Sequence, residues 1–253
     1  MVKFYLTGRV QVEGPNGLLT EHDLPGRQGR LMLARLALAR GPVPHEQLAD
    51  LFWGEDRPGS WQTTLSPLAS RIRAGFDSIG IPGRTMLLSR HGAYELVIPE
   101  RWLDAEVAIR SLDRAEGATA RGAHADAWPD AAVASAILRR PFLDGEDHPW
   151  IADWRRTLND AFTRSLSCLA EAWLALERWP LAEAIADEAM RIDPLREVAH
   201  RQRIRALAGA GNGARALRAY RELEILLAEE LGTAPSPETA ALYDRVLGVN
   251  PPG

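Results

Sequence analysis

The sequence predicts an α+β winged-helix domain followed by an all-α, tetratricopeptide-like helical domain, so that the chain is mostly α overall. Two observations carry this prediction. Residues 1–99 alternate between short strand patterns, three helical patterns and a hairpin pattern, whereas the chain from residue 102 onward is helical throughout. The later helices also carry small residues at recurring positions, which is typical of stacked helix pairs. We therefore expect domains at residues 1–99 and 100–253.

Length and composition indicate a globular cytoplasmic protein. The 253 residues are 46% hydrophobic and 25% charged, and no apolar run reaches the ~20 residues that a membrane span needs. The first ten residues, MVKFYLTGRV, lack the long apolar stretch of a secretion signal. The one cysteine, Cys168, excludes an internal disulfide and a cysteine-based zinc site, and we expect it to be buried.

Charge is distributed unevenly along the chain. Arginine supplies nearly all basic residues, with Lys3 as the one lysine, and the formal net charge is −4. The first 100 residues carry 11 basic and 10 acidic side chains and the remainder carries 19 and 24, which gives about +1 and about −5. A nucleic-acid-binding domain is usually strongly basic. The near-neutral first part does not by itself indicate DNA binding, although a local basic stripe suffices.

The first domain is expected to hold a small sheet, three helices and a hairpin. Two alternating stretches around the turn signal Pro15-Asn16-Gly17 indicate two or three short antiparallel strands. Gly41 and Pro42 end the first helix, and Ser60 is a natural N-cap for the third. The hairpin turns at His91-Gly92. In order, the expected elements are strands within residues 3–23, helices at 27–40, 44–54 and 61–76, and hairpin strands at 85–90 and 93–98.

The second domain shows a weak internal repeat. Three of its helices open on small residues, in PDAAVASA (129–136), PLAEAIADEA (180–189) and NGARALRAYRE (212–222). Small residues let neighbouring helices approach closely, and such helix pairs bury a shared core and present a groove. The strongest internal match has an offset of 32 residues and sets Ala182, Ala184 and Ile185 against Ala214, Ala216 and Leu217.

Motifs in both parts resemble known families. PFLDGEDHPWIADWRRTL (141–158), RIDPLREVAHR (191–201) and the long run from Ala216 to Leu247 closely resemble the bacterial transcriptional activator domain. LPGRQGRLMLARLALARG (24–41) and SRIR (70–73) resemble the winged-helix output domain of response regulators. In this order, the two domains have the architecture of the Streptomyces antibiotic regulatory protein family, and the resemblance covers nearly the whole chain.

This resemblance implies a DNA-binding transcriptional regulator that activates its promoters. The winged helix would bind promoter DNA, and the helical domain would support a homodimer and contact RNA polymerase. Some relatives carry further ATPase or sensor domains, and this chain resembles the short form. The sequence itself contains no GxxxxGK[ST] phosphate-binding loop, no HExxH motif and no Cys/His cluster. We therefore predict a protein that is not an enzyme and needs no cofactor or metal.

The third helix and the hairpin hold the candidate DNA contacts. Glutamine suits adenine edges, arginine suits guanine edges or phosphate, and threonine suits polar groups or a thymine methyl. For the helix residues, the alternative interpretation is a solvated helix face that binds nothing. For His91, the alternative is a simple turn residue. Because one subunit offers few arginines, useful affinity would need two subunits on adjacent sites. The candidates are Gln62, Thr63, Ser66, Arg71 and Arg73 in the helix, and Arg84, Arg90 and His91 at the hairpin.

Pro67 is a departure from a regular third helix. An interior proline removes a backbone hydrogen bond and clashes with the preceding turn, at a cost of ~3 kcal/mol. The helix would either kink at Ser66 or begin there, with Ser66 as N-cap and Pro67 in the first turn. Either arrangement moves Gln62–Leu65 off the face that holds Arg71 and Arg73. The alternative function is therefore a protein-interaction or effector-binding module that retains the winged-helix fold without sequence-specific DNA binding.

Three further features each allow two interpretations. Arg27 and Arg30 open the first helix and either touch the DNA backbone or flank the sheet. Four tryptophans pack in the helical core or line a groove for a partner peptide or effector. A band of six arginines pairs with Glu222, Glu224 and their neighbours or forms a site for an acidic partner. These residues are Trp150, Trp154, Trp173 and Trp179, and Arg201, Arg203, Arg205, Arg215, Arg218 and Arg221.

Overall fold

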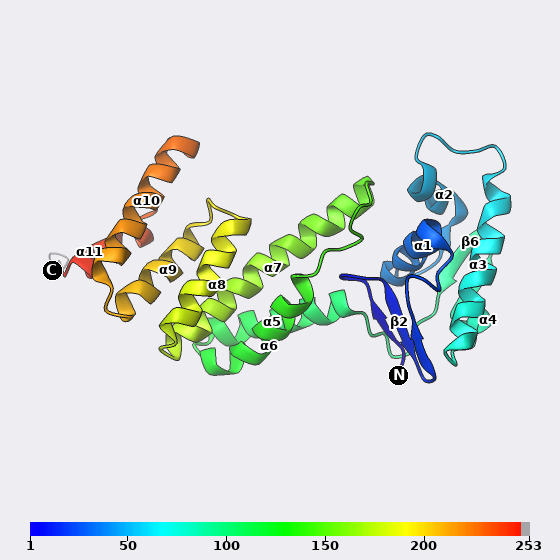
Figure 1. Ribbon diagram of the computed structural model, residues 1–253, viewed down its shortest axis with the longest axis horizontal. Coiled ribbons are helices and arrows are strands. Elements are labelled where there is room, and N and C mark those ends of the chain that lie inside the picture. Colours follow the sequence, from blue (N-terminus) through cyan, green and yellow to red (C-terminus); the bar gives the residue numbers. More distant parts are fainter. Residues whose placement is uncertain (249–253) are drawn as a thin grey trace. The chain divides into compact units, whose positions relative to one another are not determined.

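The computed structural model describes residues 1–248, which are mostly helical with two small β-sheets (Figure 1). The last five residues of the predicted second domain lie outside the described residues. The chain forms two compact units, one of Met1–Val107 with Ile137–Leu158, and one of Ala108–Ala136 with the chain from Asn159 onward. The boundary between residues 99 and 100 stays a prediction. Along residues 1–248, no helix is both long and apolar enough to cross a bilayer.

The first sheet is antiparallel in the order β1-β2-β3, as the alternating pattern predicts. Phe4, Val12 and Leu19 point to its buried face, and the Phe4 ring meets Phe76 edge-on at 6.3 Å. At the end of β2, a Cβ on Gly14 would lie 2.5 Å from the carbonyl oxygen of Ile79, so this position requires glycine. The strands are β1 (Lys3–Tyr5), β2 (Gln11–Gly14) and β3 (Gly17–Leu19).

Helices and a second sheet follow in the predicted order, with two differences. Residues 85 and 86 end a short helix rather than begin a hairpin strand, and the two-residue strand β4 is too short to give a sequence pattern. His91 (φ 49°) and Gly92 (φ 72°) form the hairpin turn, whose left-handed backbone suits the strand twist. The elements are α1 (Gly26–Leu38), β4 (Val43–Pro44), α2 (His45–Trp53), α3 (Trp61–Ser78), α4 (Gly83–Met86), β5 (Leu87–Arg90) and β6 (Ala93–Leu96), with sheet order β4-β6-β5.

Helix α3 begins at Trp61, as the predicted range 61–76 has it, and runs through Pro67, so the alternative in which the helix begins at Ser66 is wrong. Buried residues on both sides of the proline, including Leu65 and Leu68, hold the helix against the core, while Pro67 itself is exposed. Ser60 stands at the N-cap position, but its side chain makes no capping bond. Instead, its carbonyl oxygen accepts hydrogen bonds from the N–H and the hydroxyl of Thr63.

Asp104, the first residue of α5 (Asp104–Ala120), ties this helix to the chain after β1. Its buried carboxylate accepts hydrogen bonds from the N–H of Leu6 (2.8 Å), the N–H of Thr7 (3.1 Å) and the Thr7 hydroxyl (2.7 Å). Arg140 lies 3.5 Å away from the same group. The N–H of Ala105 also donates to it at 2.8 Å, so five polar partners satisfy a carboxylate that would otherwise be costly to bury.

Glu146 neutralises Arg27 and Arg30. The carboxylate is 4% exposed and accepts hydrogen bonds from the Arg27 Nε (2.6 Å) and from the Arg30 guanidinium. Arg155 of α7 (Pro149–Ala175) donates to the carbonyl oxygens of Phe142 and Glu146, both at 2.9 Å, and so holds this loop in place. Arg27 and Arg30 therefore serve the internal structure of the first unit.

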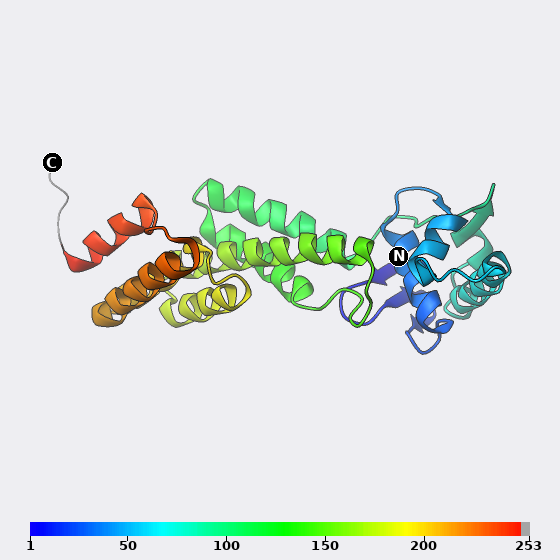
Figure 2. The same ribbon diagram turned by 90° about the horizontal axis from the view of Figure 1, so that it is seen from above.

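The second unit contains two successive helix pairs. α9 lies beside both α8 and α10 (Figures 1 and 2). α8 starts at Trp179 and α10 at Gly213, 34 residues later, which is the tetratricopeptide period. This offset aligns Ala182 with Ala216, both fully buried, so the predicted offset of 32 is wrong by two residues. The helices are α6 (His124–Leu138), α8 (Trp179–Ile192), α9 (Glu197–Gly209), α10 (Gly213–Leu231) and α11 (Pro237–Leu247).

The tryptophans pack in separate places. Trp150 and Trp154 lie against Phe142 in the first unit, and Trp173 meets Trp128 edge-on in the second. All four predicted tryptophans are partly buried. Cys168 is buried, as expected, and burial raises the pKa of its thiol, which keeps it protonated and unreactive.

Candidate nucleic-acid interface

The outward face of α3 carries short polar side chains. The helix buries one side through residues that recur at three- and four-residue spacing, from Leu65 to Phe76. Four of the five predicted helix candidates are exposed on the other side, and a single helix holds them. This exposed set comprises Gln62, Thr63, Ser66 and Arg71, with Pro67, Ser70 and Ala74 among them.

Arg73 lies differently from the other candidates because it is half-buried. Its Nε donates a 2.9 Å hydrogen bond to the carbonyl oxygen of Leu87 in β5. Next to it, α4 comes so close to α3 that a Cβ on Gly83 would lie 2.3 Å from the Arg73 carbonyl oxygen. Arg73 therefore fixes the hairpin against α3, a role that the sequence did not reveal because Leu87 is not a local neighbour.

A shallow depression of about 520 Å³ brings together arginines from three elements. Arg73 of α3, Arg84 of α4 and Arg90 of β5 all line it, and Ser70 continues it onto the exposed face of α3. Asp77 is the one carboxylate in its wall, and this group accepts a 2.8 Å hydrogen bond from the N–H of Gly83. Three cations thus face one carboxylate, which already has a backbone donor.

The exposed arginines in this region are not neutralised. Across residues 1–248, Arg71, Arg84 and Arg90 form no ion pair with a carboxylate, in contrast to Arg27 and Arg30. A charge that has no internal partner is free to meet an external anion without first breaking an existing pair. The sequence predicted these three residues, but it could not tell which arginines of the domain are already paired.

His91 lies at the tip of the hairpin and does not line the arginine depression, although its neighbour Arg90 does. It is exposed and lines a separate hollow of about 410 Å³ with Pro42, Arg90 and Glu95. Its positive φ fits the turn interpretation. Beneath the hairpin, His45 stacks on a buried tyrosine with 4.6 Å between ring centroids, and burial lowers the pKa of His45.

Comparison with known proteins gives the context of this surface. Residues 103–247 match the bacterial transcriptional activator domain. The chain belongs to the bacterial transcriptional activator domain family. This confirms the resemblance to that family and to the Streptomyces antibiotic regulatory proteins, whose members are regulators of transcription.

Relatives of this family member are longer proteins. Regulatory protein AfsR of Streptomyces griseus is 32% identical over 234 residues, which cover 87% of this chain and 22% of AfsR. Transcriptional regulatory protein EmbR of Mycobacterium tuberculosis is 28% identical over 226 residues, which cover 88% of this chain and 58% of EmbR. The chain therefore spans less than two thirds of these curated relatives.

A solved structure shares the fold of this family member. Mycobacterium tuberculosis EmbR, in complex with a low affinity phosphopeptide, superposes with a TM-score of 0.87 and 25% identity. The match covers 100% of this chain and 66% of the EmbR chain. The order of helices and small sheets described above is therefore the order of a known regulator.

Proposed function

We propose that this protein is a transcriptional activator that binds promoter DNA through a winged helix. The winged helix consists of α1–α3 and the hairpin β5–β6, and the helical domain contacts RNA polymerase or a second subunit. The proposal rests on one observation above all, the un-neutralised arginines Arg71, Arg84 and Arg90 beside the exposed face of α3. The regulatory relatives support it as well.

The chemistry of α3 suits a major groove. The groove is about 12 Å wide and admits a helix. Short side chains such as Thr63, Ser66 and Ser70 let the helix backbone approach the base edges closely. Arg71 reaches a guanine edge or a phosphate, while Arg84 and Arg90 meet phosphates beside the helix. Base contacts then supply specificity, and phosphate contacts supply position and most of the salt dependence.

The remaining parts of the proposal follow from the same role. A regulator of promoters works in the cytoplasm and needs no catalytic group, so the protein is neither an enzyme nor membrane-bound. Few free arginines per subunit make a homodimer on adjacent sites the binding unit. The second candidate function, an interaction module that does not read DNA, is favoured by Asp77 in the arginine depression and by the near-neutral charge of the first 100 residues.

DNA-binding measurements separate the two candidates. Fluorescence anisotropy with labelled duplex from the protein's own promoter region would compare the wild type with Arg71→Ala/Arg90→Ala. Each lost contact costs about 1–3 kcal/mol, so the double variant binds at least about thirty-fold more weakly and its salt slope falls by about 1–2. Arg73 is left intact, because its substitution would also loosen the hairpin.

A matched control removes two exposed arginines that lie outside the winged helix. Arg218→Ala/Arg221→Ala in α10 changes the net charge by the same amount and leaves the DNA affinity unchanged. Absence of binding by the wild type at micromolar concentration and low salt, or equal binding by the Arg71/Arg90 variant, would exclude DNA reading by this surface.

A further inference from the structure

A groove in the second unit lies among α7, α9 and α11. Two hollows of about 340 and 370 Å³ adjoin and share Arg205, Leu242 and Arg245 in their walls. Arg201 extends the wall at one end, and Leu174 and Trp179 extend it at the other. We call this the arginine groove: one end is cationic and the other is apolar.

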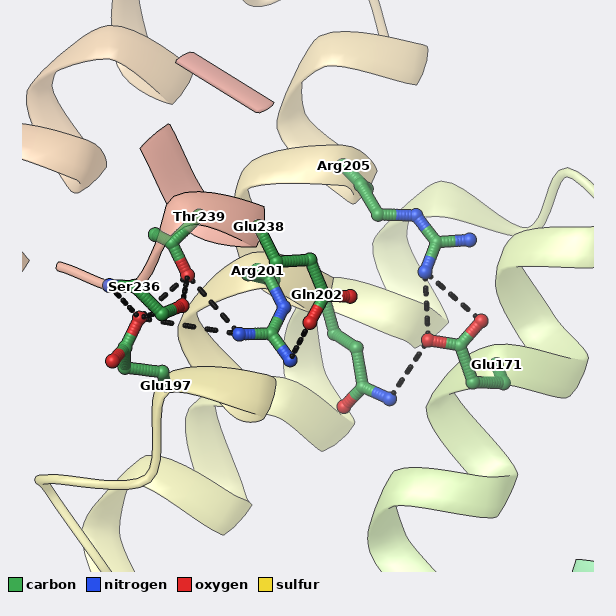
Figure 3. A network of polar contacts seen from close by, with 8 residues as sticks. All are labelled: Glu171, Glu197, Arg201, Gln202, Arg205, Ser236, Glu238 and Thr239. Atoms are coloured by element: carbon green, nitrogen blue, oxygen red, sulfur yellow. Dashed lines mark hydrogen bonds and ion pairs between the residues drawn. The ribbon is translucent and has the colours of Figure 1, made fainter. Parts of the chain in front are cut away.

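The cationic end is built by ion pairs that position its arginines (Figure 3). Arg205 of α9 meets Glu171 of α7 at 2.7 Å, and Arg201 meets Glu238 of α11 at 3.0 Å. Arg245 has no ion pair among residues 1–248. Arg201 also lies 3.9 Å from Glu197. Carboxylates therefore neutralise Arg201 and Arg205, and Arg245 supplies the groove with one positive charge that the described carboxylates leave unpaired.

Glu197 holds the α11 wall in place. Its Oε2 accepts hydrogen bonds from the N–H (3.0 Å) and hydroxyl (2.7 Å) of Ser236 and from the hydroxyl of Thr239 (2.6 Å), as Figure 3 shows. Burial acts to raise the pKa of Glu197, but these hydrogen bonds outweigh it and keep the pKa below its ordinary value. The motifs PLREVAHR and ELGTAPSPET thus meet to fix α11 against α9.

The apolar end is formed by a tryptophan held flat against α9. A Cβ on Gly209 would lie 2.8 Å from the Trp179 ring, so only glycine lets the indole approach this closely. Trp179 is partly buried by this contact, and it lines the groove together with Leu174 and Leu242. The groove therefore offers an aromatic surface beside a cation, which suits an apolar side chain flanked by carboxylates.

Exposed apolar side chains flanked by carboxylates occur on α10 of the same chain. The C-terminal half of α10 buries Leu223 and Leu227 on one side and exposes Ile225 (57%) and Leu231 (55%) elsewhere. Acidic residues surround the exposed pair, and in the described part of the chain none of Glu224, Glu229 and Glu230 forms an ion pair. In Figure 1, this end of α10 extends past α9 and α11. No residue of α10 lines the arginine groove.

We propose that the arginine groove of one copy binds the acidic, apolar end of α10 from a second copy. The second copy's Ile225 packs against Trp179 and Leu242, while its glutamates meet Arg205 and Arg245. Burial of the isoleucine supplies attraction, and the opposite charges select the orientation. This names the second subunit of the proposed function, but the association itself needs no DNA.

The two surfaces differ, so the contact is head-to-tail. Each copy in a pair still has one surface unused, and a non-closing contact of this kind lets further copies add. An interface of identical patches, by contrast, would relate the two copies by a two-fold axis.

Sedimentation velocity of the full chain from 1 to 100 µM tests the proposal. The wild type associates with increasing concentration, and Arg245→Glu or Ile225→Arg each raises the midpoint of association at least ten-fold. Arg191→Glu, an exposed arginine of α8, is the matched control and associates as the wild type does. All three substituted residues are exposed, and circular dichroism confirms that each variant is folded.

Mixing the two variants gives the decisive result. An equimolar mixture of Arg245→Glu and Ile225→Arg retains one intact groove and one intact α10, so it forms dimers with near wild-type affinity that grow no further. A wild type that stays monomeric, variants that associate normally, or a mixture that stays monomeric would each overturn the proposal. Arg71→Ala/Arg90→Ala associates normally, so failure here and failure of DNA binding are separate outcomes.

Discussion

Glu146 is a buried charge in a run, GEDHPW, that looks like a surface loop. Its partners, Arg27 and Arg30, precede it by more than 100 residues. From local patterns, these arginines either touch the DNA backbone or flank the sheet, and neither interpretation included Glu146 as their partner. Candidates at exposed positions, such as Arg71 and Arg90, could be named from residue type and place alone. Pairing between distant residues depends on the tertiary fold, which no local signal encodes.

Substitution of Glu146 tests how much this pairing stabilises the first unit. Glu146→Gln keeps the shape but leaves Arg27 without a counter-charge, while Arg30 keeps the more distant carboxylate of Glu21 at 3.9 Å. Since Arg27 is half-exposed and can regain water, we expect a loss of about 1–3 kcal/mol rather than the full cost of a broken buried pair. Urea unfolding at pH 7 measures it. Asp144→Asn, an exposed neighbour without an ion pair in the described residues, should change stability by less than about 0.5 kcal/mol.

At the scale of elements, periodicity and turn residues predicted the first unit well. Three helices and the hairpin lie where the apolar spacing, Gly41-Pro42 and His91-Gly92 put them. The two-residue strand β4, which pairs with β6 of the hairpin, was not predicted, and of the two alternatives for Pro67 the helix start at Ser66 is wrong. In α3, tertiary packing of the buried face outweighs the local cost of the proline.

Replacement of the proline should therefore strengthen α3. Pro67→Ala restores an N–H that can donate to the carbonyl oxygen of Thr63, and removes the steric clash with the preceding turn. We expect a gain of about 1–3 kcal/mol, reduced somewhat because alanine leaves the unfolded chain more freedom. Thermal or urea unfolding measures the gain. Ser66→Ala, at an exposed neighbouring position, is the control: it measures the gain that alanine gives through helix propensity alone. A Pro67→Ala variant that is less stable than the wild type would contradict the explanation.

At the scale of the whole molecule, the sequence predicted two consecutive domains. It did not predict that a later segment of the chain returns to the first unit. Residues 137–158 belong to it although they lie within the predicted second domain. Their contribution comes from Glu146 and Arg155, whose partners are known only once the chain is folded.

A fragment that ends at residue 99 tests this organisation. It lacks Asp104 and Glu146, so the backbone after β1 and the first turn of α1 lose buried partners. Each such loss costs about 1–3 kcal/mol, and together they approach the whole stability of a small domain. We expect broad, low-temperature melting by circular dichroism, with sharper melting in the full chain. Equal melting of the fragment and the full chain would place the boundary at residue 99 after all.

The bond between Arg73 and the Leu87 carbonyl has a consequence for the affinity of the proposed DNA binding. Together with the close approach at Gly83, this hydrogen bond holds α3 and the hairpin in a fixed arrangement. The side chains of this preorganised surface therefore need little ordering when DNA binds. Less conformational entropy is then lost when the complex forms, so more of each contact appears as affinity. A surface with few cations can therefore bind DNA with useful affinity, because little of the electrostatic attraction is offset by the entropy cost of ordering the surface.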